Sequence, residues 1–444
     1  MNETMRIAQF VAETDFQDLP SDLVDKAKIF VLDNLASGFV GAEQPWSKKV
    51  ASLANELGGN SEATVFNQRF KLDVSRASLV NGAMIGAFEV EHVGHSAHPG
   101  GTAFPAALAF AERERLDGRS FILAMMLGYE VTCRVGAAQT RATEDERGFH
   151  NPGVNGPFGA AAAVAKLMGL DQETTAWALG IAGSHSAGLT EFAFEGAMTK
   201  RLHLGRAAQM GLESALLARK GFTGPTTVFE GRHGYLNAVS PSPQPAKLTD
   251  GLGQEWISND LAIKAYPCHV TGQAIVHAIQ GLKERMAFSL SDIGKVSIAG
   301  GSRIVSPRHA EREPTNMLGG QYSLPFTVAV ALARDISSPV AFDEAALVDP
   351  EIRTLAKRIE VSEELALSGL ESEITLVIKG EGHTLFGNGF PGSLEYPLDY
   401  ESVAEKFRRY TEPLIDEPRV GRIIDLVRRL DGIEDMSELA GLIA

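Results

Sequence analysis

Cysteine is scarce in this sequence: only Cys133 and Cys268 occur among 444 residues. Two cysteines cannot build the disulfide framework of a small secreted domain, and so low a count suits a reducing compartment. The N-terminal segment 1–16 carries acids among its apolar residues and lacks the basic and apolar regions of a secretory signal. No uncharged apolar stretch reaches the roughly 18 residues of a membrane span. We therefore expect a cytoplasmic protein with no membrane partner.

Basic side chains are also in short supply. The 41 Lys and Arg residues face 56 Asp and Glu residues, which gives a net charge of −15. An acidic protein has no general attraction for nucleic acid, so we expect no nucleic-acid partner. If the ligand is an anion, basic side chains must be concentrated in its site.

Several cofactor signatures are absent from the sequence. There is no Walker A motif, H-E-x-x-H, EF-hand loop or C-x-x-C, and no G-x-G-x-x-G follows a clear strand. Nucleotides and iron–sulfur clusters therefore have no support, and we predict that the protein uses no cofactor.

What is present is the pattern of a large helical protein. The hydrophobic fraction of 44% and the charged fraction of 22% are typical of globular proteins, and 444 residues exceed one ordinary core. Apolar residues recur at helical spacing up to about residue 270. The expected helices are 21–41, 46–57, 74–91, 101–114, 118–139, 157–168, 172–186 and 203–219. The Ala- and Gly-rich segments 156–169 and 177–188 should be central and buried, because small residues let backbones approach closely.

The pattern changes after about residue 290. Segments 295–301, 358–365 and 371–389 are β-branched and partly alternating, which predicts strands. Segments 321–335 and 344–358 predict helices between them, and helical spacing returns after 400. The predicted fold is therefore mainly α. A large all-helical domain, 1–270 completed by 395–444, has a smaller α+β lid domain, 271–394, inserted before the C-terminal helices.

Histidines and carboxylates gather at an expected break between two helices. Residues Glu89, Glu91, His92, His95 and His98 lie in one short stretch that is rich in Gly and ends in Pro. Histidine titrates near neutral pH and can both take and give a proton. An exposed polar loop and a metal site are the alternatives. We predict no metal, because the spacing matches no established zinc signature and Gly and Pro interrupt the helix that such ligands would need.

Two further segments place ionisable groups near helix starts. His150 precedes the Ala-rich helix, where backbone N–H groups favour an anion. Lys200 and Arg201 precede another helical run, where a cation is electrostatically disfavoured, so a nearby anion or a function is expected. The alternatives are a single satisfied histidine and a solvated surface pair.

The last segment combines Lys264, Tyr266, Cys268 and His269 directly before a helix. Cys268 could be a nucleophile. No hydrolase elbow surrounds it, however, and a buried free thiol is commoner than a reactive one. We therefore expect no covalent catalysis.

Together these segments resemble the MmgE/PrpD family, which includes 2-methylcitrate dehydratase, cis-aconitate decarboxylase and iminodisuccinate epimerase. The resemblance covers nearly the whole chain. It is carried by Asn81-Gly82-Ala83, His98-Pro99, Gly128-Tyr129-Glu130-Val131, Gly148-Phe149-His150, Ala178-Leu179-Gly180, Thr199-Lys200, Gly221-Phe222-Thr223-Gly224-Pro225 and Lys264-Ala265-Tyr266-Pro267. It implies a helical domain with an α+β lid, a homodimer, and no metal or organic cofactor. It also implies a site lined by Glu89 (Asp in the family), His98, His150, Lys200 and Lys264.

Two positions depart from the family pattern. The family's Asp-Phe-Asp-Asp-Thr is here Glu89-Val90-Glu91-His92-Val93, and a position that is often Tyr is Phe326. Each Glu reaches one methylene further than Asp, and Phe326 has no hydroxyl to donate. The substrate and reaction can therefore differ from those of the well-known members.

The working hypothesis is a cofactor-independent lyase that abstracts a proton from a small di- or tricarboxylate. Lys200, Lys264 and Arg201 would neutralise substrate carboxylates, and His98 and His150 would act as base and acid, in either order. Glu89 joins the catalytic set, whereas Glu91, His92, His95, Tyr266 and His269 complete the substrate-binding set. Dehydration is the favoured outcome. The alternatives are decarboxylation, epimerisation, a metal-dependent hydro-lyase, and a non-catalytic sensor of polycarboxylates.

Overall fold

The computed structural model describes residues 2–444 and divides them into two compact units. The first unit runs to Thr190, resumes from Thr199 to Leu261 and ends with Asp399–Ala444. The second unit contains Glu191–Met198 and Ala262–Leu398. The domain boundaries expected from the sequence, near residues 270 and 395, stay a prediction.

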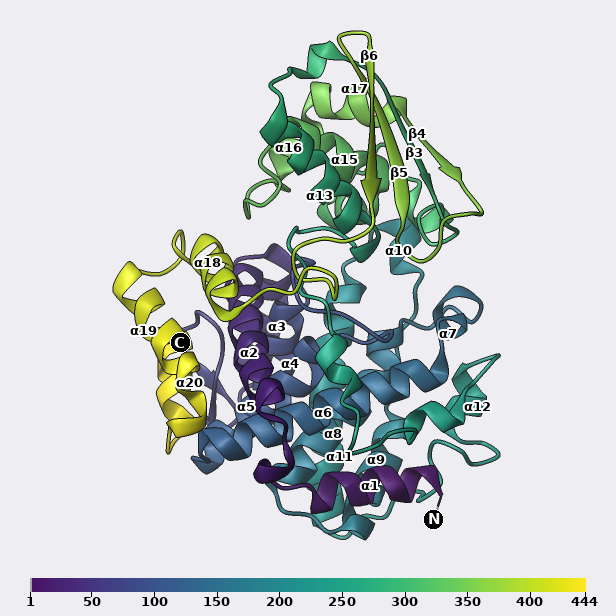
Figure 1. Cartoon of the computed structure of the whole chain (residues 1–444). Helices are drawn as coiled ribbons and strands as arrows, with labels where there is room; N and C mark the ends of the chain where they lie inside the picture. The colour runs from purple at the N-terminus through teal and green to yellow at the C-terminus, as the bar shows by residue number, and fades with distance from the viewer. Residues whose placement is uncertain (1) are drawn as a thin grey trace. The chain divides into compact units, whose positions relative to one another are not determined.

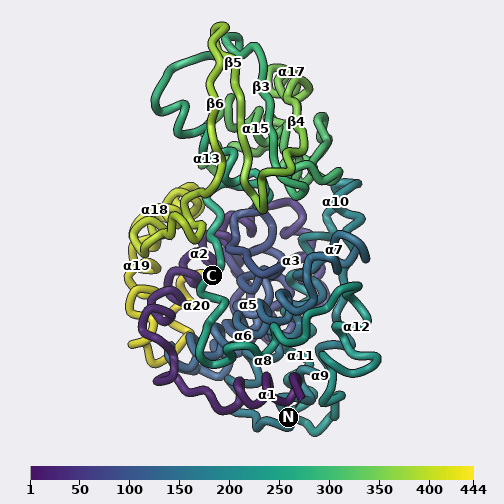
Figure 2. The backbone as a smooth tube through the Cα atoms, turned by 45° about the vertical axis from the view of Figure 1, so that its right-hand side comes forward, coloured from purple at the N-terminus to yellow at the C-terminus, as the bar shows by residue number. Residues whose placement is uncertain are grey.

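The first unit is built almost entirely of helices, as the sequence predicts (Figure 1). Its helices are α1 (Glu3–Glu13), α2 (Ser21–Ala42), α3 (Pro45–Glu56), α4 (Val74–Ile85), α5 (Pro99–Glu114), α6 (Gly118–Gln139), α7 (Ala142–Asp145), α8 (Asn151–Leu167), α9 (Gln172–Ser184), α11 (Thr199–Arg219), α12 (Tyr235–Val239), α18 (Tyr400–Thr411), α19 (Glu417–Arg428) and α20 (Ser437–Ile443). In both Figure 1 and Figure 2 the C-terminal helix α18 lies beside α2, against which it packs.

Helix α8 is the centre of this unit, as its small residues predict. Every residue from Asn151 to Ala165 is buried, and α8 packs against α5, α6, α9 and α11. Glycines make the close approaches possible. A β-carbon on Gly205 of α11 would lie 2.0 Å from the carbonyl oxygen of Leu79 in α4, and one on Gly211 would lie 2.4 Å from that of Pro157 in α8.

Helix α6 is long and apolar enough to cross a membrane by length and composition. Within the structure, however, 94% of its apolar window is buried. Burial of this kind is typical of a core helix in a globular protein.

Two local expectations for this unit are wrong. Helix α4 ends at Ile85 rather than 91, because Gly86 follows and Glu89 adopts a positive φ of 62°, which no α-helix accommodates. The unit also contains a short antiparallel pair of strands, β1 (Ala63–Thr64) and β2 (Lys71–Leu72), so it is not strictly all-helical.

The second unit contains a four-stranded mixed sheet in the order β4-β3-β5-β6. The strands are β3 (Ile293–Gly300), β4 (Ile359–Glu363), β5 (Ser372–Ile378) and β6 (Glu381–Gly387). Only β3 and β4 pair in parallel. The segment 371–389 forms two of these strands, since Lys379 and Gly380 have positive φ and turn the chain back.

Helices cover one face of this sheet. The helices of the unit are α10 (Phe192–Glu195), α13 (Val270–Arg285), α14 (Met317–Tyr322), α15 (Leu324–Ala333), α16 (Glu344–Val348) and α17 (Pro350–Arg358). Helices α13 and α15 pack against the strands and each other (Figure 1). Ile374, Leu376 and Ile378 of β5 are buried and alternate with more exposed residues, as expected when one face is covered.

The short helix α10 belongs to the second unit although the chain on both sides of it belongs to the first. Phe192 of α10 packs with Leu318 and Tyr322 in a small apolar cluster. The Phe192 and Tyr322 rings meet edge to face at a centroid distance of 6.1 Å. This cluster is what attaches α10 to the second unit.

Glycine packing in the helical unit gives a stability prediction. Gly205→Ala is expected to lower the free energy of unfolding by about 1–3 kcal/mol, since its β-carbon would overlap the carbonyl of Leu79. Gly421→Ala in α19 is the matched control, because nothing lies within 4 Å of its β-carbon. That change should raise stability by up to about 1 kcal/mol. Urea unfolding followed by circular dichroism measures both, and equal effects would contradict the close-packing argument.

Candidate active site

The loop between α4 and α5, residues 86–98, carries most of the histidines and carboxylates predicted from the sequence. Glu89 in this loop is buried and has a positive φ of 62°. A non-glycine residue in this conformation costs free energy and persists only where its surroundings fix it. The contacts of Glu89, Glu91 and His92 provide that fixation.

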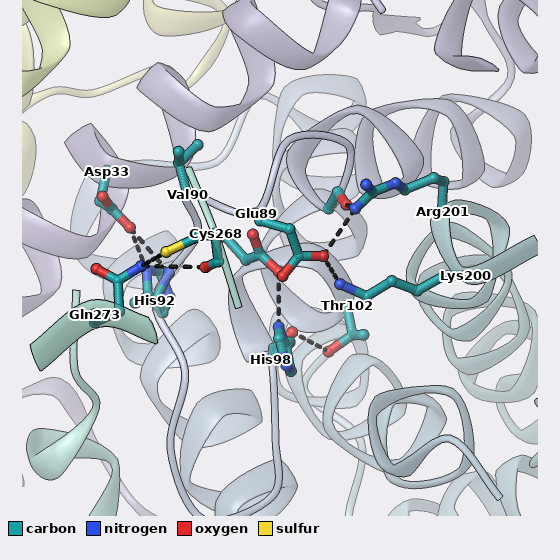
Figure 3. Close-up of polar contacts among 12 residues, drawn as sticks. Asp33, Glu89, Val90, His92, His98, Thr102, Lys200, Arg201, Cys268 and Gln273 are labelled. Atoms are coloured by element: carbon teal, nitrogen blue, oxygen red, sulfur yellow. Dashed lines mark hydrogen bonds and ion pairs between the residues drawn. The ribbon is translucent and has the colours of Figure 1, made fainter. Parts of the chain in front are cut away.

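Glu89 forms ion pairs with two cations of helix α11 (Figure 3). Its Oε1 atom contacts Lys200 Nζ and lies 2.8 Å from Arg201 Nη1, and all three side chains are buried. Arg201 also donates to the carbonyl of Gly86 at 3.1 Å. Lys200 and Arg201 lie in the first turn of α11, where the helix dipole disfavours cations, so a carboxylate there is stabilising. Glu89 is thus the anion whose presence the position of Lys200 suggested.

Glu91 holds the imidazole of His98. The Nδ1–H of His98 donates to Glu91 Oε1 at 2.8 Å. Glu91 is buried, whereas the His98 side chain is 18% exposed. A carboxylate that accepts the Nδ1–H hydrogen bond fixes the tautomer of a neutral imidazole in which the lone pair lies on Nε2. Glu89 and Glu91 are two residues apart in the chain; Glu89 binds two cations, whereas Glu91 orients the imidazole of His98.

His92 lies inside a buried polar network rather than at a surface. Its backbone N–H and its Nδ1–H both donate to Asp33 Oδ2, at 3.1 and 2.8 Å. Its Nε2 lies 3.1 Å from the hydroxyl of Tyr129, which accepts a hydrogen bond from Asn34 at 2.7 Å. His92 is 0% exposed and both ring nitrogens are engaged. His92 holds the loop through these contacts, and the substrate contact predicted for it from the sequence stays a prediction.

A buried lysine completes this network. Lys406 of α18 contacts Asp33 Oδ1 at 2.6 Å and donates to the carbonyl of Val90 at 2.7 Å. Burial works against ionisation of Asp33, but Lys406 and His92 outweigh it and hold the pKa of Asp33 below its usual value. Burial also lowers the pKa of His92, which keeps its ring neutral.

His95 occupies a tight turn, and its acidic partner differs from that of His92. Residues His95 and Ser96 both have positive φ between Gly94 and Ala97, which form a β-bridge. His95 Nε2 lies 4.0 Å from Asp260 Oδ2. Since His92, His95 and His98 contact Asp33, Asp260 and Glu91 respectively, the three imidazoles do not share one coordination sphere. Within residues 2–444, no group of three or more His, Cys, Asp or Glu side chains is arranged to hold a metal ion.

His150 meets a second histidine that the sequence analysis did not place in the site. It precedes α8 as its N-cap residue and is 3% exposed. Its Nδ1 lies 3.0 Å from Nδ1 of His203 in α11. Burial, and then the charge of Lys200, lowers the pKa of His203 to about 4. His203 therefore contacts His150 and is influenced by the charge of Lys200.

In the second unit, the residues before α13 are fixed mainly by Gln273. Its side-chain oxygen accepts the N–H groups of Ala265 and Tyr266, and its Nε2 donates to the carbonyls of Tyr266 and Cys268. Tyr266 contacts His277 Nδ1 through its hydroxyl at 3.2 Å. Lys264 is 1% exposed. Burial raises the pKa of the Cys268 thiol to about 12.

The ring of His269 packs, tilted, against the rings of two residues that sequence reasoning did not single out. Its ring lies 4.4 Å from that of His309 and 4.8 Å from that of Tyr322, measured between centroids. Its backbone N–H donates to the carbonyl of Gln321 at 2.9 Å. His309 contacts the carbonyl of Tyr322 through Nδ1 at 3.0 Å. Two predicted site residues of this unit thus have separate partners: Tyr266 contacts Gln273 and His277, whereas His269 contacts His309 and Tyr322.

The structure therefore gathers the predicted residues in small groups: Glu89 with Lys200 and Arg201, Glu91 with His98, and His150 beside Lys200 through His203. The residues missed by sequence reasoning are Asp33, Lys406, His203 and His309. Two of them left a signal. Asp33 is an acid on a helix whose neighbours are apolar, and His203 follows Lys200 by three residues, which places it on the same helical face.

Comparison with known proteins agrees with this arrangement. Residues 5–248 match the MmgE/PrpD N-terminal domain, and residues 266–432 match the MmgE/PrpD C-terminal domain. The chain therefore belongs to the MmgE/PrpD family of enzymes, as its sequence resemblance indicated.

Individual relatives are similar over nearly the whole chain. The cis-aconitate decarboxylase-like protein oryM of Aspergillus oryzae is 29% identical, covering 100% of this chain and 97% of that protein. The cis-aconitate decarboxylase of Aspergillus terreus is 28% identical, covering 99% and 95%. The cis-aconitate decarboxylase of Homo sapiens is 27% identical, covering 96% and 91%. These relatives favour the decarboxylase alternative over the dehydratase that the sequence analysis put first.

The buried ion pair gives a prediction for stability and its pH dependence. Lys406→Met leaves Asp33 buried without its cation and should cost about 3–5 kcal/mol at neutral pH. Lys48→Met is the control, because its pair with Glu43 is exposed and worth under about 1 kcal/mol.

The penalty of Lys406→Met should shrink as the pH falls below about 4. The pKa of Asp33 is lowered in the folded protein, so its ionic contribution is present above its unfolded pKa and is lost on acidification. Urea unfolding of both proteins, repeated at steps of about one pH unit from roughly pH 3 to neutrality, measures the penalty. A penalty that stays constant with pH would contradict an ionised Asp33.

Proposed function

We propose that this chain is a cofactor-independent lyase that decarboxylates a small tricarboxylate of the cis-aconitate kind. The observation that carries the proposal is the joint placement, on one buried loop, of Glu91 with its histidine and of Glu89 with its two cations. The names of the relatives supply the reaction and the substrate class.

The proposed chemistry needs positive charge and a proton donor. When the bond between carbon and a carboxylate breaks, CO2 leaves and the electron pair stays on the carbon skeleton. A proton must then form a new C–H bond at that electron-rich system. Lys200 and Arg201 would stabilise the remaining carboxylates and the developing charge. His98, oriented by Glu91, and His150 are the proposed proton-transfer groups.

The remaining predicted residues keep their proposed roles. Lys264, Tyr266 and His269 of the second unit are proposed substrate contacts, as is His95 of the helical unit. Glu89 acts in this proposal by setting the position of Lys200 and Arg201, both of which it contacts. We propose further that the enzyme is a cytoplasmic homodimer.

Dehydration is the second candidate, with epimerisation of a related polycarboxylate behind it. All three reactions use an acid–base pair next to cations, so the same side chains could support each of them. Decarboxylation is placed first because the named relatives are decarboxylases. The direct test is therefore one that reports every outcome at once.

Proton NMR in D2O of EDTA-treated protein with cis-aconitate, 2-methylcitrate, citrate and iminodisuccinate provides that test. We expect release of CO2 from cis-aconitate and incorporation of deuterium into the product. Consumption of a hydroxy acid with new vinyl signals would replace decarboxylation by dehydration. If no acid reacts until a divalent metal is added, the metal-independent proposal is wrong.

Variants of the Glu91–His98 pair test the mechanism. His98→Gln should lower kcat by about 100-fold or more, since a positioned acid or base contributes about that much. Glu91→Gln should lower kcat by about 10- to 100-fold, because the imidazole loses a charged hydrogen-bond partner. His233→Gln changes an exposed histidine and is the matched control. A His98→Gln enzyme with near-normal kcat and unchanged thermal stability would remove His98 from the reaction.

A further inference from the structure

The contact between His150 and His203 has a property that the other histidine contacts lack. It joins two atoms of the same kind, Nδ1 to Nδ1, at 3.0 Å, with ring centroids 5.1 Å apart. Two such nitrogens form a hydrogen bond only when one carries a hydrogen and the other does not. The tautomers of the two rings are therefore coupled, because fixing one fixes the other.

The backbone around Gly188 holds both rings in this relation. The carbonyl of Gly188 accepts the backbone N–H of His150 at 3.0 Å. A β-carbon on Gly188 would lie 3.2 Å from Nδ1 and 3.3 Å from Cγ of His203, so this glycine lies against the imidazole. Its φ of +142° also favours glycine. His203 is thus confined between Gly188 on one side and its own helix on the other.

The charges around the pair favour a neutral His203. Lys200, one turn earlier on α11, disfavours a second positive charge, and burial adds to this effect. Glu144 of α7 accepts a hydrogen bond from Asn151 at 3.0 Å. His150 contacts the imidazole of His203, whereas His98 contacts a carboxylate.

We propose that His203 is a positioning residue that fixes the ring orientation and the tautomer of His150. The kinetic part of this inference rests on the proposed function, whereas the structural part does not. With its tautomer fixed, His150 has one ring nitrogen that donates and one that accepts, as a proton-transfer group needs.

Three variants test the kinetic part. His203→Leu has a similar volume but no ring nitrogen, and it should lower kcat about tenfold or more while KM changes little. His203→Asn places an amide oxygen close to the former Nδ1 and should restore most of the lost kcat. His233→Leu is the control at an exposed histidine. Equal kcat in His203→Leu and His203→Asn, at equal thermal stability, would overturn the positioning role.

Nitrogen-15 NMR of the histidine side chains tests the structural part without any substrate. The signals of His150 are assigned by their loss in His150→Gln. We expect one dominant tautomer of His150 in the unchanged protein and in His203→Asn, and an averaged mixture in His203→Leu. An identical His150 tautomer in His203→Leu would overturn the inference. If the unchanged protein converts no polycarboxylate, the proposed function fails, and this measurement still decides the coupling of the two rings.

Discussion

The ion pair between Asp33 and Lys406 is the interaction on which the candidate site most depends. It joins helix α2, close to the beginning of the chain, to helix α18, close to its end. Lys406 also binds the carbonyl of Val90, and Asp33 binds both the backbone and the ring of His92. The loop is therefore held at Val90, between Glu89 and Glu91, and again at His92, directly after Glu91. Because a buried charge must keep its partner, this pair fixes the two carboxylates in place.

The parts of the fold that the sequence predicts are those with a local cause. Apolar spacing locates helices such as Ser21–Ala42 and Gly118–Gln139 within a residue or so, and β-branched runs locate the strands of the second unit. Apolar spacing does not predict where α4 ends, because the conformation of the following loop depends on partners distant in sequence and on the positive φ of Glu89. The sequence pattern also does not predict that α10 belongs to the second unit, because this depends on Phe192 packing against Leu318 and Tyr322.

The site shows the same division between local and distant causes. The unusual position of Lys200 at a helix start correctly pointed to a nearby anion, but only the fold identifies that anion as Glu89. The sequence placed His98 in the catalytic set and His92 and His95 in the substrate-binding set, without indicating how each ring is held. In the structure His92 is buried in the core, whereas the side chain of His98 is partly exposed. His203 lies on the helical face of Lys200, as its spacing indicates, but its contact with His150, 53 residues away in sequence, follows only from the fold.

The excursion of α10 has a consequence for how the protein can be divided. A fragment containing 262–398 alone would keep the sheet and its helices but lose Phe192, which would leave an apolar socket formed by Leu318 and Tyr322 open to water. A fragment that stopped before Glu191 would lack α11. It would therefore lose Lys200 and Arg201, which pair with Glu89, and His203, which contacts His150. The two units are thus interlaced along the chain, so neither can be separated from the other by a single cut.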